Sequence, residues 1–415
     1  MKKLFFPLFI ILISIIIGYQ ILSIWRGLSI YQTNPSKESL LKAIRLNPSN
    51  PDPYYRLGLF YQWDIHNIDL KESLNYLSKA IERNPLEQEY WLNLAKILQR
   101  LGKQEASEKV LEKAIFTYPT SFRGRWMTGN LLLQQGVPEK AIPHFTYILS
   151  NYPNQSGLVY DVLLRALDNP EIIMERVVPK DPSSLRQYLS YLYEMSNKEL
   201  AQKVWQKMLS FGFKPDRDET LRHIEFLIAQ GELTEASRIW VSRLREEGLS
   251  TPSDENLITN GGFEKNEILG GGFDWKIGKV AGAEISFDHE IAFEGKSSLK
   301  IVFNGKENVD FRHIYQFVAL KPDTDYLFKA TVKTRGITTK SGIKIEVSGI
   351  VSAFQRLSES LTGDNEWRDL TISFRTPANS KGGLVRVRRE RTDKFDRFIS
   401  GVVWIDKVSV TEKGQ

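Results

Sequence analysis

The chain has 415 residues, of which 41% are hydrophobic and 26% are charged, a balance that is ordinary for a folded protein of two or three domains. It has no cysteine, which excludes disulfides, thiolate metal sites and a cysteine nucleophile. The formal net charge of +6 is a mild excess without a long basic block, so we do not expect nucleic acid as a partner.

The N-terminus reads MKKLFFPLFIILISIIIGYQILSIWR, with no charged residue over 4–25. A helix of this length rises about 33 Å, enough to cross a bilayer. We therefore predict an uncleaved transmembrane anchor over 1–26. The alternative is a cleaved signal peptide, which typically has a shorter apolar core and a small-x-small site. Lys2 and Lys3 outweigh Arg26, which predicts a single-pass protein of the inner (cytoplasmic) membrane with a cytoplasmic N-terminus and a periplasmic or extracytoplasmic bulk.

A helical pattern with a repeat of 34 residues follows over 35–250, and Pro85, Pro119 and Pro153 mark it most clearly. The spacing and the small residues around it resemble the tetratricopeptide repeat family, with its pattern W-x2-L-G-x2-Y…A-x3-F…P. The best repeats lie within 51–153. A degenerate continuation over 155–250 is indicated by equivalent pairs, which are Ala201 and Ala236, then Trp205 and Trp240.

The family resemblance implies that the first helix of each repeat lines a concave groove for a protein partner. The expected groove residues are Tyr55, Gln62, Glu89, Lys96, Gln99, Arg123, Trp126 and Asn130. Trp126 lies one place beyond the usual core tryptophan, so we expect it to face the groove as a binding anchor. The alternatives are that Trp126 packs beneath an insertion in the first repeat, near 63–69, and that the polar members are only solvated.

After a linker at 248–256, the hydrophobic period changes from about 3.6 to 2, which indicates strands. Several short strands without a helical pattern predict a β-sandwich over 256–412. We interpret NLITNGGFE, 256–264, as its first strand. The other predicted strands are SSLKIVF, HIYQFVAL, YLFKATVKT, IKIEVSG, RDLTISF, LVRVRRE and VVWIDKVSV.

The motifs NGGFE, AFEGKSSLKI, YQFVALKPDTDY, FRTP and VWIDKVSV, in this order, resemble carbohydrate-binding modules of the family 4, 9 and 22 type. The resemblance implies a galactose-binding-like jelly roll. The expected fold is thus multidomain: an N-terminal transmembrane helix, an all-α tetratricopeptide-type solenoid and a C-terminal all-β jelly-roll sandwich.

The resembling modules often hold a structural calcium where the first strand, an EGK-type turn and the last strand meet. By that resemblance, Glu264 and Asp406 supply carboxylates and the turn at 295–298 offers carbonyls, which are ligands that calcium accepts. The alternative is that the two carboxylates only satisfy loop amides.

The strand over 311–320 decides the question of sugar binding. Ile314, Val318 and Leu320 alternate with a row of aromatic residues, and one face of a sandwich strand normally faces the core. We expect Phe311, His313, Tyr315 and Phe317 on the wet face, where aromatic rings stack on the apolar faces of pyranose rings. The alternative is that the aromatic row is core and the faces are reversed.

Two arginines, Arg386 and Arg388, lie on the opposite side of LVRVRRE from Val385 and Val387 and complete the expected glycan site. Arginine hydrogen-bonds sugar hydroxyls or grips carboxylates in bidentate fashion, and the latter would suit an acidic polysaccharide.

The sequence has no G-x-S-x-G, H-E-x-x-H or Walker motif, and its five histidines are scattered, so we do not expect an enzyme. We expect a membrane-anchored adaptor that binds a protein partner through its repeats and a glycan through its sandwich, in bacterial exopolysaccharide or envelope assembly. The main alternative is a pure protein scaffold without sugar binding. A cell-wall-active enzyme is the least expected reading.

Overall fold

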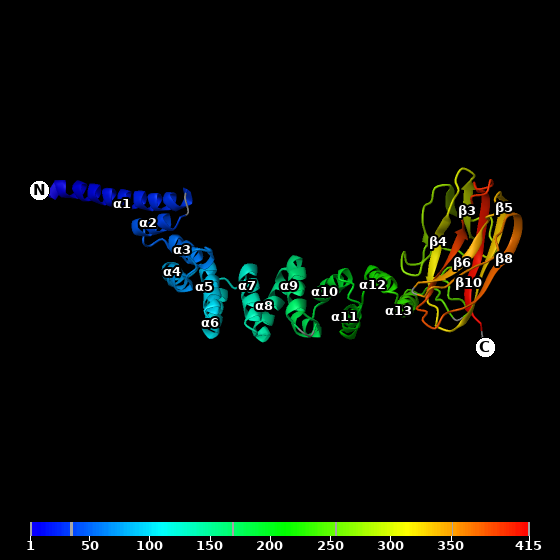
Figure 1. Cartoon of the computed structure of the whole chain (residues 1–415), viewed down its shortest axis with the longest axis horizontal. Coiled ribbons are helices and arrows are strands. Elements are labelled where there is room, and N and C mark those ends of the chain that lie inside the picture. Colours follow the sequence, from blue (N-terminus) through cyan, green and yellow to red (C-terminus); the bar gives the residue numbers. More distant parts are fainter. Residues whose placement is uncertain (1, 34–35, 168–169, 254, 351, 414–415) are drawn as a thin grey trace. The chain divides into compact units, whose positions relative to one another are not determined.

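The structure is a computed structural model that describes residues 2–33, 36–167, 170–253, 255–350 and 352–413. Its contacts divide the chain into two compact units, Met1–Phe211 and Gly212–Gln415. The first unit is helical, whereas the second holds a helix pair and all the strands assigned within the described residues (Figure 1).

The first helix, α1 (Lys2–Thr33), is longer than the predicted segment 1–26. It contains one stretch, Ile10–Thr33, that is long and apolar enough to cross a membrane, a property that a signal sequence shares. Its C-terminal part is buried against α2 (Lys37–Leu46), where Gly27 and Tyr31 face α2 and Ser23 Oγ donates to the Leu46 carbonyl at 2.7 Å. The helix continues past residue 26 because its last turns pack against α2 in the manner of a repeat.

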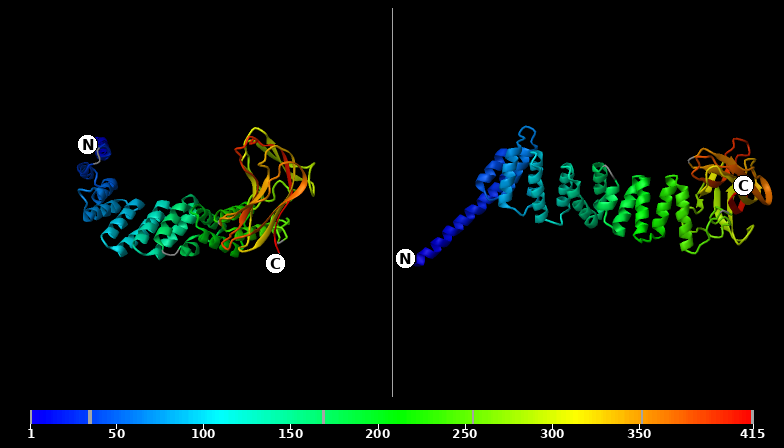
Figure 2. Two further views of the ribbon diagram at one scale, coloured as in Figure 1. Left: turned by 45° about the vertical axis from the view of Figure 1, so that its right-hand side comes forward. Right: turned by 90° about the horizontal axis from the view of Figure 1, so that it is seen from below.

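The rest of the first unit is a series of antiparallel helix pairs (Figure 2). Its elements are α3 (Pro51–Trp63), α4 (Leu70–Arg83), α5 (Gln88–Arg100), α6 (Gln104–Thr117), α7 (Phe122–Gln134), α8 (Pro138–Asn151), a 3-10 turn (Pro153–Gln155), α9 (Ser156–Ala166), a π-helical turn (Ile173–Val177), α10 (Pro182–Glu194) and α11 (Lys198–Ser210).

Small residues at the repeat spacing let the paired helices approach closely. A Cβ added at Gly58 of α3 would lie 2.7 Å from Leu77 of α4, and one at Gly129 of α7 would lie 2.8 Å from Phe145 of α8. Ser73 Oγ donates to the Gly58 carbonyl at 2.7 Å, so a buried hydroxyl is also satisfied across the pair. These contacts explain the 34-residue period, and the predicted solenoid is confirmed.

The second unit begins with a helix pair, α12 (Arg217–Ala229) and α13 (Leu233–Glu246), and continues as two five-stranded antiparallel sheets. One sheet has the order β1-β4-β9-β6-β7 and the other β2-β3-β10-β5-β8. The strands are β1 (Lys276–Ile277), β2 (Ala283–Asp288), β3 (Ser298–Asn304), β4 (Phe311–Val318), β5 (Asp325–Ile337), β6 (Lys344–Gly349), β7 (Gln355–Leu357), β8 (Gly363–Arg375), β9 (Gly383–Arg389) and β10 (Ser400–Glu412).

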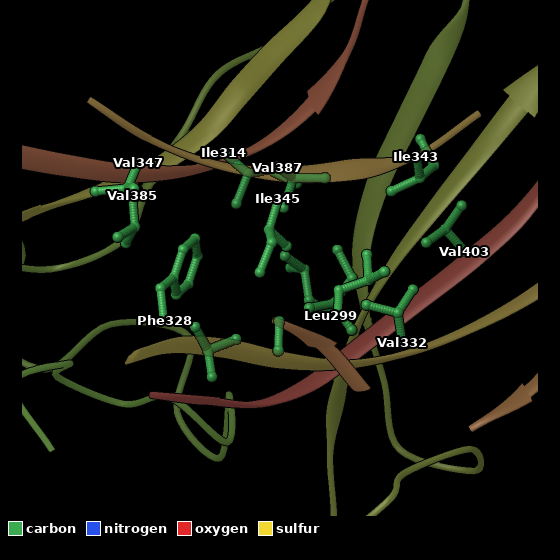
Figure 3. Packing of buried hydrophobic residues seen from close by; sticks show 14 of the residues in the cluster. Leu299, Ile314, Phe328, Val332, Ile343, Ile345, Val347, Val385, Val387 and Val403 are labelled. Atoms are coloured by element: carbon green, nitrogen blue, oxygen red, sulfur yellow. The ribbon is translucent and has the colours of Figure 1, made fainter. Parts of the chain in front are cut away.

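The core lies between the two sheets, as the alternating pattern predicts. Figure 3 shows Ile314 and Val387 of one sheet facing Leu299, Val332 and Val403 of the other. The predicted all-β sandwich is confirmed, with β1, β2 and β7 added to the predicted strands.

The prediction of a first strand over 256–264 is wrong, because this segment forms no regular strand. Leu257 N donates to the Val410 carbonyl and Gly261 accepts from Val408 N, both at 2.9 Å, so the segment does follow β10. Asn260, with φ of 54°, has the left-handed conformation, which breaks the extended backbone that a ladder needs.

The helix pair α12–α13 packs directly onto the sandwich. Trp240 of α13 is 0% exposed, its ring lies 6.1 Å from that of Phe273, and its Nε1 donates to Thr259 Oγ1 at 3.2 Å. A Cβ added at Gly382, before β9, would lie 2.7 Å from Leu233. The last repeat therefore belongs to the compact unit of the sandwich, although the secondary structure changes only after residue 250.

Candidate functional site

The outer face of β4 carries three of the four expected aromatic residues. Ile314 and Val318 are buried in the core, whereas His313, Tyr315 and Phe317 lie half-buried on the opposite face. Phe311 does not belong to the row: a register shift between positions 311 and 314 turns it into the core, where it is 0% exposed. A bulge adds one residue and so reverses the facing of everything before it.

The rings of Tyr315 and Phe317 on β4 form a corner rather than a flat platform. The Tyr315 and Phe317 rings have centroids 5.7 Å apart and are inclined by 85°. One ring can therefore stack beneath a flat ligand while the other borders it. Burial, together with the Arg312 guanidinium, lowers the pKa of the neighbouring His313, so its imidazole is neutral at pH 7.

Both expected arginines lie on the same face, and the strand order brings them beside the aromatic row. In register, Arg386 of β9 lies opposite Tyr315 of β4 on one side and opposite Glu346 of β6 on the other. A row of aromatic ring, guanidinium and carboxylate thus crosses three adjacent strands, where side chains directly opposite each other are in contact range.

Glu346 is the residue of this site that the sequence analysis missed. It is 0% exposed although it points to the outer face, because Arg386, Arg388 and Gln355 cover it. Arg386 forms an ion pair with Glu346 Oε1, while Arg388 Nε lies 3.4 Å from Oε2 and its Nη1 pairs with Asp310. The alternation of IKIEVSG already places position 346 opposite the buried residues, so its facing was predictable.

Two polar atoms inside this cluster make no hydrogen bond of their own to any residue that the structure describes. Gln355 Nε2 donates to Glu346 Oε1 at 2.9 Å, yet Glu346 Oε2 and Arg386 Nε are buried and make no hydrogen bond within the described residues. Both atoms are covered, so a ligand hydroxyl on this face would meet the partly exposed side chains of Arg386 and Arg388 instead.

The two residues predicted for calcium reach the same turn, over 293–296. Both oxygens of Glu264 accept from Lys296 N, at 2.9 and 3.2 Å, and Asp406 Oδ2 accepts from Phe293 N at 2.8 Å. No group of three or more acidic, histidine or cysteine side chains with metal-ligand geometry occurs in the described part of the chain. The turn presents N–H donors to both carboxylates, as in the alternative interpretation, and calcium stays a prediction of the resemblance.

In the repeats, three expected groove residues form one polar cluster across consecutive first helices. Glu89 Oε1 of α5 accepts from Arg123 of α7 at 2.7 Å and from the Tyr55 hydroxyl of α3 at 3.4 Å. Asn93, which the sequence analysis did not select, donates to both Glu89 and Tyr55 at 3.0 Å. Burial and the Glu89 carboxylate raise the pKa of Tyr55, so its hydroxyl stays a donor.

Three further expected groove residues, Lys96, Gln99 and Gln62, differ from one another in their exposure and contacts. Lys96 Nζ lies 4.4 Å from the centroid of Trp63, at the insertion, and burial with Arg100 lowers the pKa of Lys96. Gln99 is half-buried. Gln62 is 1% exposed, and its amide makes no hydrogen bond within the described residues, so it does not line the groove as a solvated side chain.

Trp126 is half-buried and belongs to an aromatic cluster of its own repeat. Its ring stacks on Phe122 with centroids 6.1 Å apart and meets the buried Phe145 edge-on at 6.0 Å. Asn130 Nδ2 donates to the Trp126 carbonyl at 2.7 Å. Trp126 therefore packs within α7 and α8, and the insertion near 63–69 contacts Lys96 instead.

Comparison with known proteins finds both modules. Residues 255–394 match the family model described as a carbohydrate binding domain, and residues 88–116 match that of the tetratricopeptide repeat. Among curated proteins, the tRNA(Glu)-specific nuclease WapA of Bacillus subtilis subsp. natto (strain BEST195) is 26% identical over 168 residues. The tRNA nuclease WapA of Bacillus subtilis (strain 168) is 24% identical over 169 residues. Each match covers 39% of this chain but only 7% of the relative.

Solved structures similar to parts of the chain are of the same two kinds. A family 16 carbohydrate-binding module is 25% identical and covers 38% of this chain and 100% of its own, with a TM-score of 0.27. The CBM22-1 xylan-binding domain of Paenibacillus barcinonensis Xyn10C is 15% identical over 40% and 100%, with a TM-score of 0.29. MamA is 18% identical over 32% and 88%, with a TM-score of 0.26. The two family models thus identify a tetratricopeptide repeat in the helical part of the chain and a carbohydrate-binding-type domain in its C-terminal part.

Proposed function

We propose that the protein is a membrane-anchored extracytoplasmic adaptor that binds a glycan on the outer face of the sheet β1-β4-β9-β6-β7 and a protein partner on its repeats. The observation that carries the glycan half is the row of Tyr315, Arg386 and Glu346 across three strands, with Phe317 beside it. Partly exposed aromatic rings next to partly exposed guanidinium groups suit a ligand with apolar ring faces and hydroxyl rims.

The charges of this face favour neutral sugar residues. Arg386 and Arg388 are paired with Glu346 and Asp310, so the two positive charges are balanced by two negative ones. A carboxylate arriving at Arg386 would have to displace Glu346, which is buried and would be left without its partner. The expectation that these arginines grip an acidic polysaccharide is therefore replaced by hydrogen bonding to hydroxyls.

The protein-binding half rests on the polar cluster of Tyr55, Glu89, Asn93 and Arg123, which joins three consecutive repeats. The membrane half rests on the apolar stretch of α1. A glycan-binding module, a partner-binding array and an anchor in one chain suit exopolysaccharide or envelope assembly, and such an adaptor needs no catalytic group.

The test is affinity electrophoresis of the full chain in detergent micelles against a panel of neutral and acidic polysaccharides. We expect retardation by at least one neutral polysaccharide, and loss of that retardation in a Tyr315→Ala/Phe317→Ala variant. The matched control is Phe293→Ala/Trp367→Ala, which removes an aromatic pair, with centroids 5.8 Å apart, from the region of the other sheet. If no polysaccharide retards a folded chain, the protein scaffold without sugar binding becomes the better reading.

A further inference from the structure

A pocket of about 550 Å³ lies between α13 and the segment that follows β4. One face of the helix supplies most of its wall, and the lining residues are Thr234, Ser237, Arg238, Val241, Ser242, Arg245, Ala319 and Lys321. Both walls belong to the second compact unit. The helix is held in place by the close approach of Leu233 to Gly382 and by the buried Trp240, so the pocket is a fixed part of that unit.

The aromatic row of β4 leads into this pocket. Tyr315, Phe317 and Ala319 alternate with the core residues Val318 and Leu320, so all three face the same side. Residues two apart on a strand are about 7 Å apart along it. A saccharide chain lying on the two rings therefore reaches the pocket with its next residues.

The pocket has the chemistry that the sheet lacks. Its wall contains two guanidinium groups, one ammonium group and three hydroxyls, and no carboxylate. Arg238 and Lys321 are paired with Glu235 and Glu412, which lie outside the lining. Arg245 is exposed and forms no ion pair within the described ranges of the chain. Arg245 of α13 thus offers an exposed positive charge that no carboxylate in the described part of the chain balances, whereas both arginines of the sheet are ion-paired.

We propose that this pocket binds an anionic substituent, such as a carboxylate or a sulfate or phosphate ester, on the saccharide whose neutral rings lie on Tyr315 and Phe317. The inference rests on the proposed glycan binding and extends it. The ligand would be an acidic polysaccharide that contacts both the sheet and α13. The sheet would bind the sugar rings and hydroxyls, and α13 would bind the negatively charged substituent. Guanidinium forks match carboxylate and phosphate geometry, and the hydroxyls supply further donors.

The test uses the full chain in detergent micelles and pairs of polysaccharides that share a backbone and differ in charge. De-esterified and fully methyl-esterified homogalacturonan test a carboxylate, and dextran sulfate and dextran test a sulfate. We expect the charged member of one pair to bind about tenfold more tightly at low salt, a difference that added salt reduces. Arg238→Gln/Arg245→Gln should remove most of that preference and leave the affinity for the neutral member unchanged.

The control is Arg335→Gln/Arg375→Gln, which removes the same charge from exposed positions on β5 and β8 of the other sheet. Equal binding of both members by the natural chain overturns the inference, and so does an equal loss of preference in the control. Binding of neutral members alone contradicts this inference but not the proposed function. Failure to bind any of the four polysaccharides contradicts both.

Discussion

The helical repeats and the β-sandwich place their exposed polar residues by different rules. In the repeats, positions 89 and 123 are equivalent, and the helices that carry them and Tyr55 are neighbours in sequence and in space. In the sandwich, β4, β9 and β6 are neighbours in the sheet but far apart in sequence. A cluster between consecutive repeats follows from local periodicity, whereas a cluster across crossover strands depends on the whole topology.

The largest expected effect tests where the two regions meet. Trp240→Ala should destabilise the second unit by about 3–5 kcal/mol, because it leaves a cavity against Phe273 and an unpaired Thr259 hydroxyl. Chemical denaturation of the full chain measures this loss of stability. Far-UV circular dichroism monitors the helices, and infrared absorption monitors the strands.

The matched variant is Trp205→Ala, at the equivalent position of α11 in the first unit. This variant should lower the denaturation midpoint of the helical transition and leave the midpoint of the sandwich transition unchanged. A sandwich transition that is insensitive to Trp240→Ala would mean that the last repeat is only tethered to it.

The second prediction contrasts two carboxylates, each of which is paired with arginine. Glu346→Gln should cost about 3 kcal/mol, because it leaves Arg386 covered and without its buried counter-charge. Glu89→Gln in the repeats should cost less than about 1 kcal/mol, since its partner Arg123 is largely exposed to solvent. Thermal unfolding of both variants compares them, and equal costs would contradict the difference in burial between the two clusters.

Local patterns predicted which way most of these side chains face. The alternation of β4 separates Ile314 and Val318 from Tyr315 and Phe317, and it fails only at Phe311, where a bulge leaves no signature in the residue types. The burial of Glu346 could not be predicted in the same way. It depends on β6 and β9 being neighbours, and antiparallel strands that are separated in sequence pair in many possible orders.

The packing of α13 on the sandwich also could not be predicted from the sequence. Trp240 has the same repeat position as Trp205, and nothing local indicates that one covers a repeat and the other covers the loop around Phe273. Long-range packing of this kind is specified by surfaces that form only after each module has folded.

The third prediction concerns calcium, which the resemblance implies for the sandwich and not for the repeats. If calcium is held at Glu264 and Asp406, chelator should lower the melting temperature of the sandwich by about 5–10 °C, as loss of a ligand at 100 times its dissociation constant would. The helical transition should not move. Asp406→Asn should abolish the response to chelator, and a melting temperature that chelator leaves unchanged would favour the amide hydrogen bonds as the whole role of these residues.

The smallest effect compares one histidine of each compact unit, each shielded from solvent on a repeat helix, as the pH falls. Burial lowers the pKa of His223 on α12 to about 3, and burial with the Arg125 guanidinium lowers the pKa of His144 on α8 to about 4. Both imidazoles bind protons more readily in the unfolded chain, where the pKa is about 6.5. Each therefore contributes stability that is fully present above about pH 6.5 and is lost progressively as the pH falls toward its folded pKa.

Between pH 7 and pH 5 we expect a loss of roughly 2 kcal/mol for each imidazole, at about 1.4 kcal/mol for each pH unit below 6.5. His223→Gln should flatten this dependence in the second unit, and His144→Gln should flatten it in the first. Added salt should distinguish the two histidines further. It screens the repulsion between Arg125 and a protonated His144, whereas the effect of burial on the pKa of His223 does not depend on salt. Denaturation midpoints at pH 5, 6 and 7 in low and high salt measure the difference, and an identical salt response at both sites would contradict the role given to Arg125.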